Sequence, residues 1–112
     1  TGSTAYSLSG GGPILHPNID AITLLPMFPQ SLSTSPLIVS AKSEIRVELI
    51  DKRLRSQLSF DSQDSINLKG LSKIIIAKSE SVLSLIHPED HDFFEGCRNK
   101  LGWSSGLENK AK

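Results

Sequence analysis

Residues 1–17, TGSTAYSLSGGGPILHP, combine Ser and Thr hydroxyls, one tyrosine, three consecutive glycines and two prolines without any charged side chain. Hydroxyls, a ring that can stack and a backbone that allows close approach suit a polar, planar ligand such as a nucleotide. On chemistry alone, an ordinary capped helix with a half-buried tyrosine is the favoured interpretation. The glycine spacing matches neither the Rossmann fingerprint nor the P-loop.

The absence of charge continues well beyond this segment. Residues 1–41 contain one charged side chain, Asp20, whereas the remaining acidic and basic residues all lie in 42–112. Five of the six prolines also fall in the uncharged part. Because a solvent-facing surface normally carries many charges, this distribution favours burial against a core, a further domain or another subunit.

Composition limits the class of protein. The chain has 112 residues, 38% of them hydrophobic and 21% charged, which is typical of one globular domain. We expect that domain to cover 1–103 and to be followed by a disordered tail, 104–112. Twelve basic and twelve acidic residues cancel, so the sequence has no electrostatic footprint for nucleic acid or an anionic membrane. No apolar run is long enough to span a bilayer. The lone Cys97 suits a reducing cytoplasm.

Hydrophobic patterning predicts a mainly β fold with short terminal helices, most simply a β-sandwich. A helix is expected over 4–9, with Ser3 or Thr4 as its N-cap and the glycines as its end. A second helix is expected to have Pro88 in its first turn and to stop at Gly102. Strands are predicted at 20–27, 37–39, 43–50, 57–60, 73–77 and 82–86, with 43–50 and 57–60 paired as one hairpin and 73–77 and 82–86 as another.

Other candidate sites have simpler explanations. His87 and His91 stand four residues apart among carboxylates, but an acidic, solvated helix start is the stronger interpretation, so no metal ligand is assigned. No G-x-S-x-G elbow supports a serine hydrolase. Cys97 fits a packed helix face better than it fits a nucleophile. Asp61 closes the strand-like 57–60, where a carboxylate facing a cleft and a turn-forming aspartate are equally good interpretations.

Several segments in order resemble bacterial NAD kinases, over almost the whole of 1–103. TGSTAYSLS with GGP and IL-HP is the most specific segment, and LLPMFPQSLSTSPLIV, FDSQ, LIHPEDHDFF and KLGW resemble later ones. Gly10 departs from the pattern, since relatives often have alanine there. This substitution is expected to loosen the helix end without removing a contact.

The resemblance implies the C-terminal, β-rich, NAD-binding part of an enzyme that also has an N-terminal α/β domain. Such enzymes transfer the γ-phosphate of ATP to the 2′-hydroxyl of the adenosine ribose of NAD. The substrates implied are NAD and ATP, together with a divalent metal such as Mg²⁺. A homo-oligomer, a dimer or a tetramer, is also implied.

By the same resemblance, residues of the first segment line the adenosine side of the NAD pocket: Thr4, Ala5, Tyr6 and Ser9. Phe28 matches a position that approaches the nicotinamide end of NAD bound to a neighbouring subunit. Asp61 and Ser62 match positions near the 2′-oxygen, where Asp61 would place or polarise the reacting group as an auxiliary catalytic residue.

The family's GGDG motif, which carries the usual general base, does not occur in these 112 residues, nor does its Asn-Glu/Asp pair. Because the chain begins inside the TGSTAY segment, we expect it to be part of a larger enzyme and to be inactive by itself. Two alternatives remain open. One is a non-catalytic remnant that binds a nucleotide or mediates assembly, and the other is a lipid or sphingoid kinase, which the run from TGSTAY to KLGW disfavours.

Overall fold

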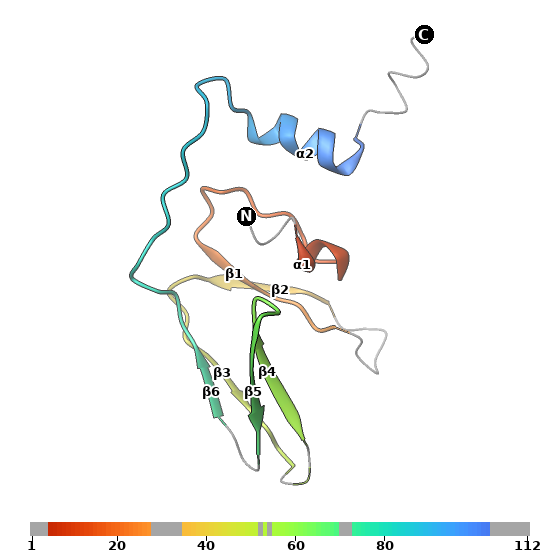
Figure 1. The fold of residues 1–112 in the computed structure, drawn as a ribbon, viewed down its shortest axis with the longest axis vertical. Helices are drawn as coiled ribbons and strands as arrows, with labels where there is room; N and C mark the ends of the chain where they lie inside the picture. Colours follow the sequence, from red (N-terminus) through yellow and green to blue (C-terminus); the bar gives the residue numbers. More distant parts are fainter. Residues whose placement is uncertain (1–4, 28–34, 52, 54, 70–72, 104–112) are drawn as a thin grey trace. The chain divides into compact units, whose positions relative to one another are not determined.

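The computed structural model describes residues 5–27, 35–51, 53, 55–69 and 73–103. The chain divides into two compact units, Thr1–Glu80 and Ser81–Lys112. The predicted tail, 104–112, lies outside the described residues. The predicted domain, 1–103, contains the boundary between the two units, so its limits stay a prediction. Figure 1 shows the strands in the first unit and the longer helix in the second.

The described part of the first unit contains one short helix, α1 (Tyr6–Ser9), and six strands that form three antiparallel pairs. These pairs are β1 (Ala21–Leu24) with β2 (Leu37–Ser40), β3 (Ile45–Glu48) with β6 (Lys73–Ile76), and β4 (Ser56–Phe60) with β5 (Asp64–Leu68). The predicted class, mainly β with short helices at both ends, is confirmed.

The alternation predicted for 43–50 is present in β3. Val47 lies opposite Ile74 and Ile45 opposite Ile76, so these side chains share one face of the pair, and Arg46 lies on the other. The predicted partner was wrong, however, because β3 pairs with β6 and not with β4. Alternation determines which face of a strand is apolar, but it carries no information about the partner strand.

The β4 strand forms its hairpin with the segment that follows it directly, Asp64–Leu68, for which we predicted no strand. One face of this hairpin carries uncharged polar side chains, and Gln57 Nε2 donates a hydrogen bond to Ser65 Oγ at 3.0 Å. The other face carries Leu58 opposite Ile66. The polar residues between Ile66 and Leu68 and before them hid this strand from a prediction based on hydrophobicity, although its apolar residues are two positions apart as in a strand.

The strand predicted at 82–86 is not formed, so the predicted pair of 73–77 with 82–86 was wrong. Residues 82–86 have no strand assignment, and Val82 and Ile86 are 81% and 97% exposed. β-branched residues favour extended backbone, but a strand also needs a neighbouring ladder of hydrogen bonds. The β6 strand has β3 as its partner instead.

In the second unit, α2 (Phe93–Leu101) begins later than predicted. Pro88 lies in a turn, where its carbonyl accepts a hydrogen bond from His91 N at 3.0 Å. Asp92 is the N-cap, because its Oδ1 accepts a hydrogen bond from Phe94 N at 2.9 Å. The helix ends at Gly102, whose φ of 67° is left-handed, so this predicted stop is confirmed.

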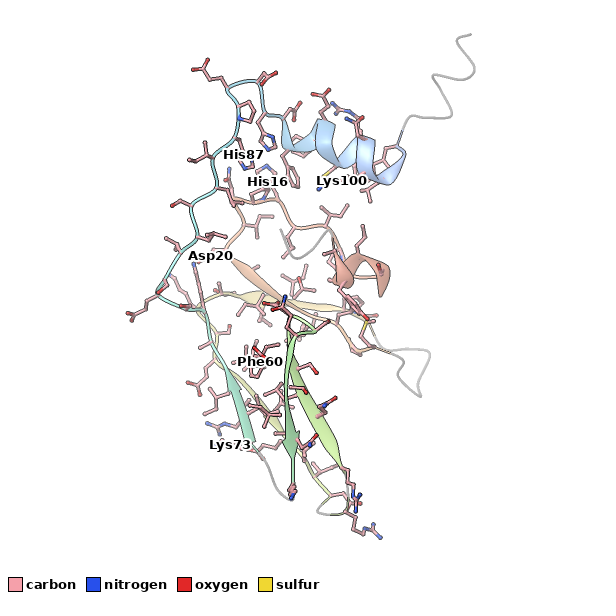
Figure 2. All side chains as sticks on the ribbon, in the orientation of Figure 1. His16, Asp20, Phe60, Lys73, His87 and Lys100 are labelled. Atoms are coloured by element: carbon pink, nitrogen blue, oxygen red, sulfur yellow. The ribbon has the colours of Figure 1, made fainter. Side chains whose placement is uncertain are left out.

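Burial is sparse. Of the hydrophobic residues that the structure describes, only Ala41 and Cys97 are buried, each with 5% of its surface exposed. Asp20, labelled in Figure 2, precedes β1 and forms an ion pair with Lys78, which follows β6. The Asp20 carbonyl also accepts a hydrogen bond from Ala41 N at 3.0 Å. Asp20, the single charged residue among 1–41, therefore links the β1–β2 pair to the β3–β6 pair.

Candidate functional site around α1 and the β4–β5 turn

The first segment forms the helix α1 (Tyr6–Ser9), followed by a tight glycine turn. The residue before its first turn is Ala5, which provides no side-chain hydrogen bond, and the predicted N-caps Ser3 and Thr4 lie outside the described residues. A four-residue helix without a side-chain cap has little intrinsic stability. The backbone N–H groups of Gly10, Gly11 and Gly12 donate hydrogen bonds to its carbonyl oxygens.

Two of the following glycines are required by the backbone. Gly11 has φ of 87°, a conformation that side-chain-bearing residues adopt at a cost. Gly12 is buried, donates to the Ser7 carbonyl at 2.8 Å, and would bring an added Cβ within 2.8 Å of that same oxygen. The chain after α1 is therefore folded back tightly beneath the helix, which confirms the predicted helix end.

The predicted ligand-contacting residues of this segment lie together on α1 and at its cap. Ala5, Tyr6 and Ser9 are all exposed, and the Tyr6 side chain is 76% accessible to solvent. Thr4 lies outside the described residues. An exposed phenol ring beside a hydroxyl can stack on a planar base, which is the chemistry that the sequence suggested for this segment.

Gly10 has a role that the sequence did not reveal. It ends α1, and its N–H lies 3.2 Å from the carbonyl oxygens of both Tyr6 and Ser7. An added Cβ would overlap Met27 Sδ and lie 2.9 Å from Leu25 Cδ2. Instead of merely loosening the helix end, the glycine makes room for side chains that follow β1. Phe28, the next predicted site residue, lies outside the described residues.

Asp61 and Ser62 occupy the turn between β4 and β5, and both have left-handed backbone, with φ of 49° and 58°. The Phe60 carbonyl, which precedes them, accepts a hydrogen bond from Gln63 N at 2.9 Å and closes the turn. Positive φ at both central residues is what tight hairpin turns require, and aspartate is among the residues that tolerate it. Asp61 is therefore turn-forming and exposed, and a carboxylate that faces a cleft stays a prediction.

The two groups of candidate residues lie on separate elements of the first unit, α1 and the β4–β5 turn. In the view of Figure 1, this turn lies at the end of its hairpin toward the β1–β2 pair. Sequence reasoning did not predict that the Met27 side chain lies beside Gly10.

No metal centre is defined by the residues that the structure describes, because they contain no group of three or more His, Cys, Asp or Glu suited to hold an ion. His87 and His91 instead stack on each other, with ring centroids 3.9 Å apart and planes inclined by 7°. Within the same described ranges, no helix is long and apolar enough to cross a membrane.

A helix with an exposed tyrosine, a close glycine turn and a strained acidic turn is compatible with nucleotide binding, and comparison with known proteins specifies the family. The model for the ATP-NAD kinase C-terminal domain matches residues 1–88. The chain therefore belongs to the ATP-NAD kinase C-terminal domain family.

Its relatives are longer than the chain. An NAD kinase of Teredinibacter turnerae is 48% identical over 97% of this chain and 38% of the relative. An NAD kinase of Marinobacter nauticus is 50% identical over 96% of this chain and 37% of the relative. The crystal structure of a yeast NADH kinase complexed with NADH superposes with a TM-score of 0.68 and 32% identity, over 94% of this chain and 34% of that one. The chain thus spans little more than a third of these proteins.

Proposed function

We propose that this chain is the part of an NAD kinase that provides the adenosine side of the NAD pocket, in an enzyme that makes NADP from NAD and ATP. The observation that supports this most strongly is the family match over 1–88, together with relatives named NAD kinase at close to half identity. The alternative, a remnant that binds a nucleotide without turnover, shares the pocket residues and differs only in chemistry.

In this proposal, α1 and its cap hold the adenosine. Tyr6 stacks on or packs against the adenine, and Thr4, Ala5 and Ser9 line the pocket beside it. The exposure of Tyr6 supports this role, since 76% of the side chain is available for contact. Phe28 extends the site toward the nicotinamide end of NAD in a neighbouring subunit.

The reaction joins the ribose 2′-oxygen to the γ-phosphorus of ATP, breaks the bond from that phosphorus to the β–γ bridging oxygen, and releases ADP. The 2′-hydroxyl proton passes to a base, for which this chain offers no GGDG aspartate. Asp61 orients the 2′-hydroxyl by accepting its hydrogen bond, and Ser62 lies beside it in the turn. Positioning of this kind supplies much of the catalysis in phosphoryl transfer.

A divalent metal such as Mg²⁺ would neutralise charge on the ATP phosphates when bound. The described residues include no cluster that fits it, so no step is assigned to a metal held by this chain. Homo-oligomer formation is proposed from the uncharged first 41 residues and from exposed apolar side chains such as Leu37, which is 56% exposed. The lone thiol and balanced charge support a cytoplasmic location.

The test uses the protein as its gene encodes it, supplied with ATP, Mg²⁺ and either NAD or NADH. We expect ATP-dependent formation of NADP from NAD, measured with an NADP-specific dehydrogenase. The NADH arm determines whether the preference resembles that of the yeast relative. NAD binding without turnover would establish the remnant alternative, and absence of both would overturn the proposal.

Tyr6→Ala provides the site-specific test of the pocket. Loss of the ring removes stacking worth about 0.5–1.5 kcal/mol beyond its buried area, so we expect the NAD KM to rise by about three- to tenfold. Tyr6→Phe is the matched control, because it keeps the ring and removes only the hydroxyl. An unchanged KM for NAD in Tyr6→Ala would exclude α1 from the pocket.

A further inference from the structure

The tip of the β4–β5 hairpin carries two carboxylates and no basic side chain. Asp61 begins the turn, and Asp64 begins β5 opposite Phe60, which is labelled in Figure 2. Both aspartates are exposed. From residue 56 to residue 68 they are the only charged residues of the sequence, so this hairpin is negative at its tip.

In the part of the chain that the structure describes, no side-chain cation neutralises these two carboxylates. Asp51, by contrast, has Oδ2 at 3.0 Å from Arg53 Nη2. Neither Asp61 nor Asp64 forms an ion pair with a described residue. The negative field of the tip is therefore screened by water and salt instead of by a paired side chain.

The backbone at Asp61 is fixed by the turn. Its φ is 49°, that of Ser62 is 58°, and the Phe60 carbonyl accepts a hydrogen bond from Gln63 N at 2.9 Å. A tight hairpin turn with these torsion angles holds each Cα–Cβ bond in one direction. Since the aspartate side chain is short, a ligand bound at this turn stays close to the carboxylate.

A carboxylate interacts differently with the substrate and the product of the proposed reaction. It accepts a hydrogen bond from the neutral 2′-hydroxyl of NAD. In NADP the same oxygen carries a phosphate with about 1.5 to 2 negative charges, which would lie about 4 Å from the carboxylate. Even in bulk water, one or two such charges repel it enough to weaken binding by about five- to thirtyfold. During transfer the phosphoryl group is metaphosphate-like and carries less charge, so the repulsion acts most strongly on the finished product.

We propose that Asp61 makes the site discriminate against its own product: the carboxylate that orients the 2′-hydroxyl of NAD repels the 2′-phosphate of NADP and favours its release. This inference rests on the proposed NAD kinase function and on the place of Asp61 beside the 2′-oxygen in it. Asp64 adds a second negative charge at the same tip, and the proposal assigns it no contact with the ligand.

The experiment compares equilibrium binding of NAD and NADP to the protein as its gene encodes it. Calorimetry without ATP gives the two dissociation constants at low and high ionic strength, about 0.05 M and about 0.5 M NaCl. The readout is the ratio of the NADP value to the NAD value, because the pyrophosphate and its salt dependence are common to both ligands. The variants are Asp61→Asn and Asp64→Asn. Asp90→Asn is the matched control, since it removes the same charge from an exposed residue of the second unit.

We expect the ratio to fall by about five- to thirtyfold in Asp61→Asn, by a smaller factor in Asp64→Asn, and to stay unchanged in Asp90→Asn. In the wild type, high salt should also lower the ratio, because it screens the repulsion. In Asp61→Asn the ratio should depend less on salt. This comparison separates lost repulsion from a new hydrogen bond donated by the asparagine amide to the phosphate.

An unchanged ratio in Asp61→Asn, or a larger change in Asp64→Asn than in Asp61→Asn, would overturn the discrimination by Asp61. A wild-type ratio that does not depend on salt would overturn it as well, whether or not Asp61→Asn folds. In each of these cases, turnover of NAD by the wild type leaves the proposed function intact. A wild type that neither binds nor phosphorylates NAD would overturn both.

Discussion

Individual residues at the end of α1 are constrained by backbone geometry more than by side-chain chemistry. Gly11 has a left-handed φ, Gly12 lies against the Ser7 carbonyl and Gly10 receives Met27. Three adjacent glycines thus serve three different purposes. A substitution at each position should therefore destabilise this turn for a different physical reason.

Gly11→Ala places a Cβ on left-handed backbone, although no atom lies within 4 Å of that Cβ. We expect a loss of about 1–2 kcal/mol in the free energy of unfolding, from backbone strain alone. Urea unfolding monitored by circular dichroism measures it. Gly96→Ala, in a helix and without strain, should not lose stability. Equal losses in the two variants would argue against the left-handed backbone as the cause.

At Asp51, hydrogen bonds from the side chain and then the backbone of Arg53 lower the carboxyl pKa below its ordinary value. A lowered pKa in the folded state stabilises the protein above the ordinary Asp value and loses that contribution as the pH falls through the lowered pKa. Carboxyl chemical shifts should show that Arg53→Ala raises the Asp51 pKa toward its ordinary value. An unchanged Asp51 titration would contradict the contact.

Among the elements, the β4–β5 hairpin combines an ordinary ladder with a strained turn. Asp61 and Ser62 both have positive φ, and neither is a glycine. Local strain of this kind persists where the surrounding structure imposes it, and it is frequent at functional sites. The hairpin thus presents an exposed carboxylate and a hydroxyl on defined backbone.

Asp61→Asn preserves left-handed tolerance while removing the charge. We expect kcat for NAD phosphorylation to fall by more than tenfold while the NAD KM changes by less than about threefold, because the carboxylate orients the 2′-hydroxyl. Steady-state kinetics on the protein as its gene encodes it measures both constants. Asp64→Asn, which neutralises a carboxylate in the same hairpin, is the control. Activity equal to wild type in Asp61→Asn would leave Asp61 a turn-forming residue only.

Local elements were easier to predict from sequence than their partners. The alternation of Ile45 and Val47 located β3, and Gly102 located the end of α2, because both signals are local. Pairing of β3 with β6 depends on residues far apart in sequence, so local alternation assigned β4 instead. Asp64–Leu68 was missed because polar residues interrupt it, and 82–86 was overestimated because β propensity does not supply a partner.

The candidate site followed the same rule. Tyr6 and Ser9 lie on one helix as the motif predicted, and Asp61 and Ser62 share one turn. The contact of Met27 with Gly10 had no signal in the sequence, because it depends on where β1 leads the chain. Only the three-dimensional structure shows which side chains fill the space beside a glycine.

At the scale of the whole molecule, the described chain leaves much apolar surface uncovered. Ile50, Val82, Leu83 and Ile86 are each more than 80% exposed. A chain of this size normally buries roughly two-thirds of the surface of its unfolded state. Surface of this kind favours association with further chain or with another copy.

For the 112 residues expressed alone, we therefore expect no steady-state NADP formation and strong binding of the dye ANS, which reports exposed apolar surface. ANS fluorescence and the coupled NADP assay measure the two properties. The protein as its gene encodes it is the comparison and should bind less dye per chain. Turnover of NAD by the isolated chain would contradict the prediction.

The single thiol of the molecule has a practical consequence. Cys97 is the only cysteine in the sequence, and its side chain is 5% exposed on α2. A thiol reagent such as DTNB should therefore react with Cys97 when that helix opens, and its rate in the absence of denaturant reports either the opening rate or the opening equilibrium constant multiplied by the intrinsic rate of the exposed thiol. The rate of this thiol reaction, followed by absorbance, therefore measures the opening of α2 without any introduced label.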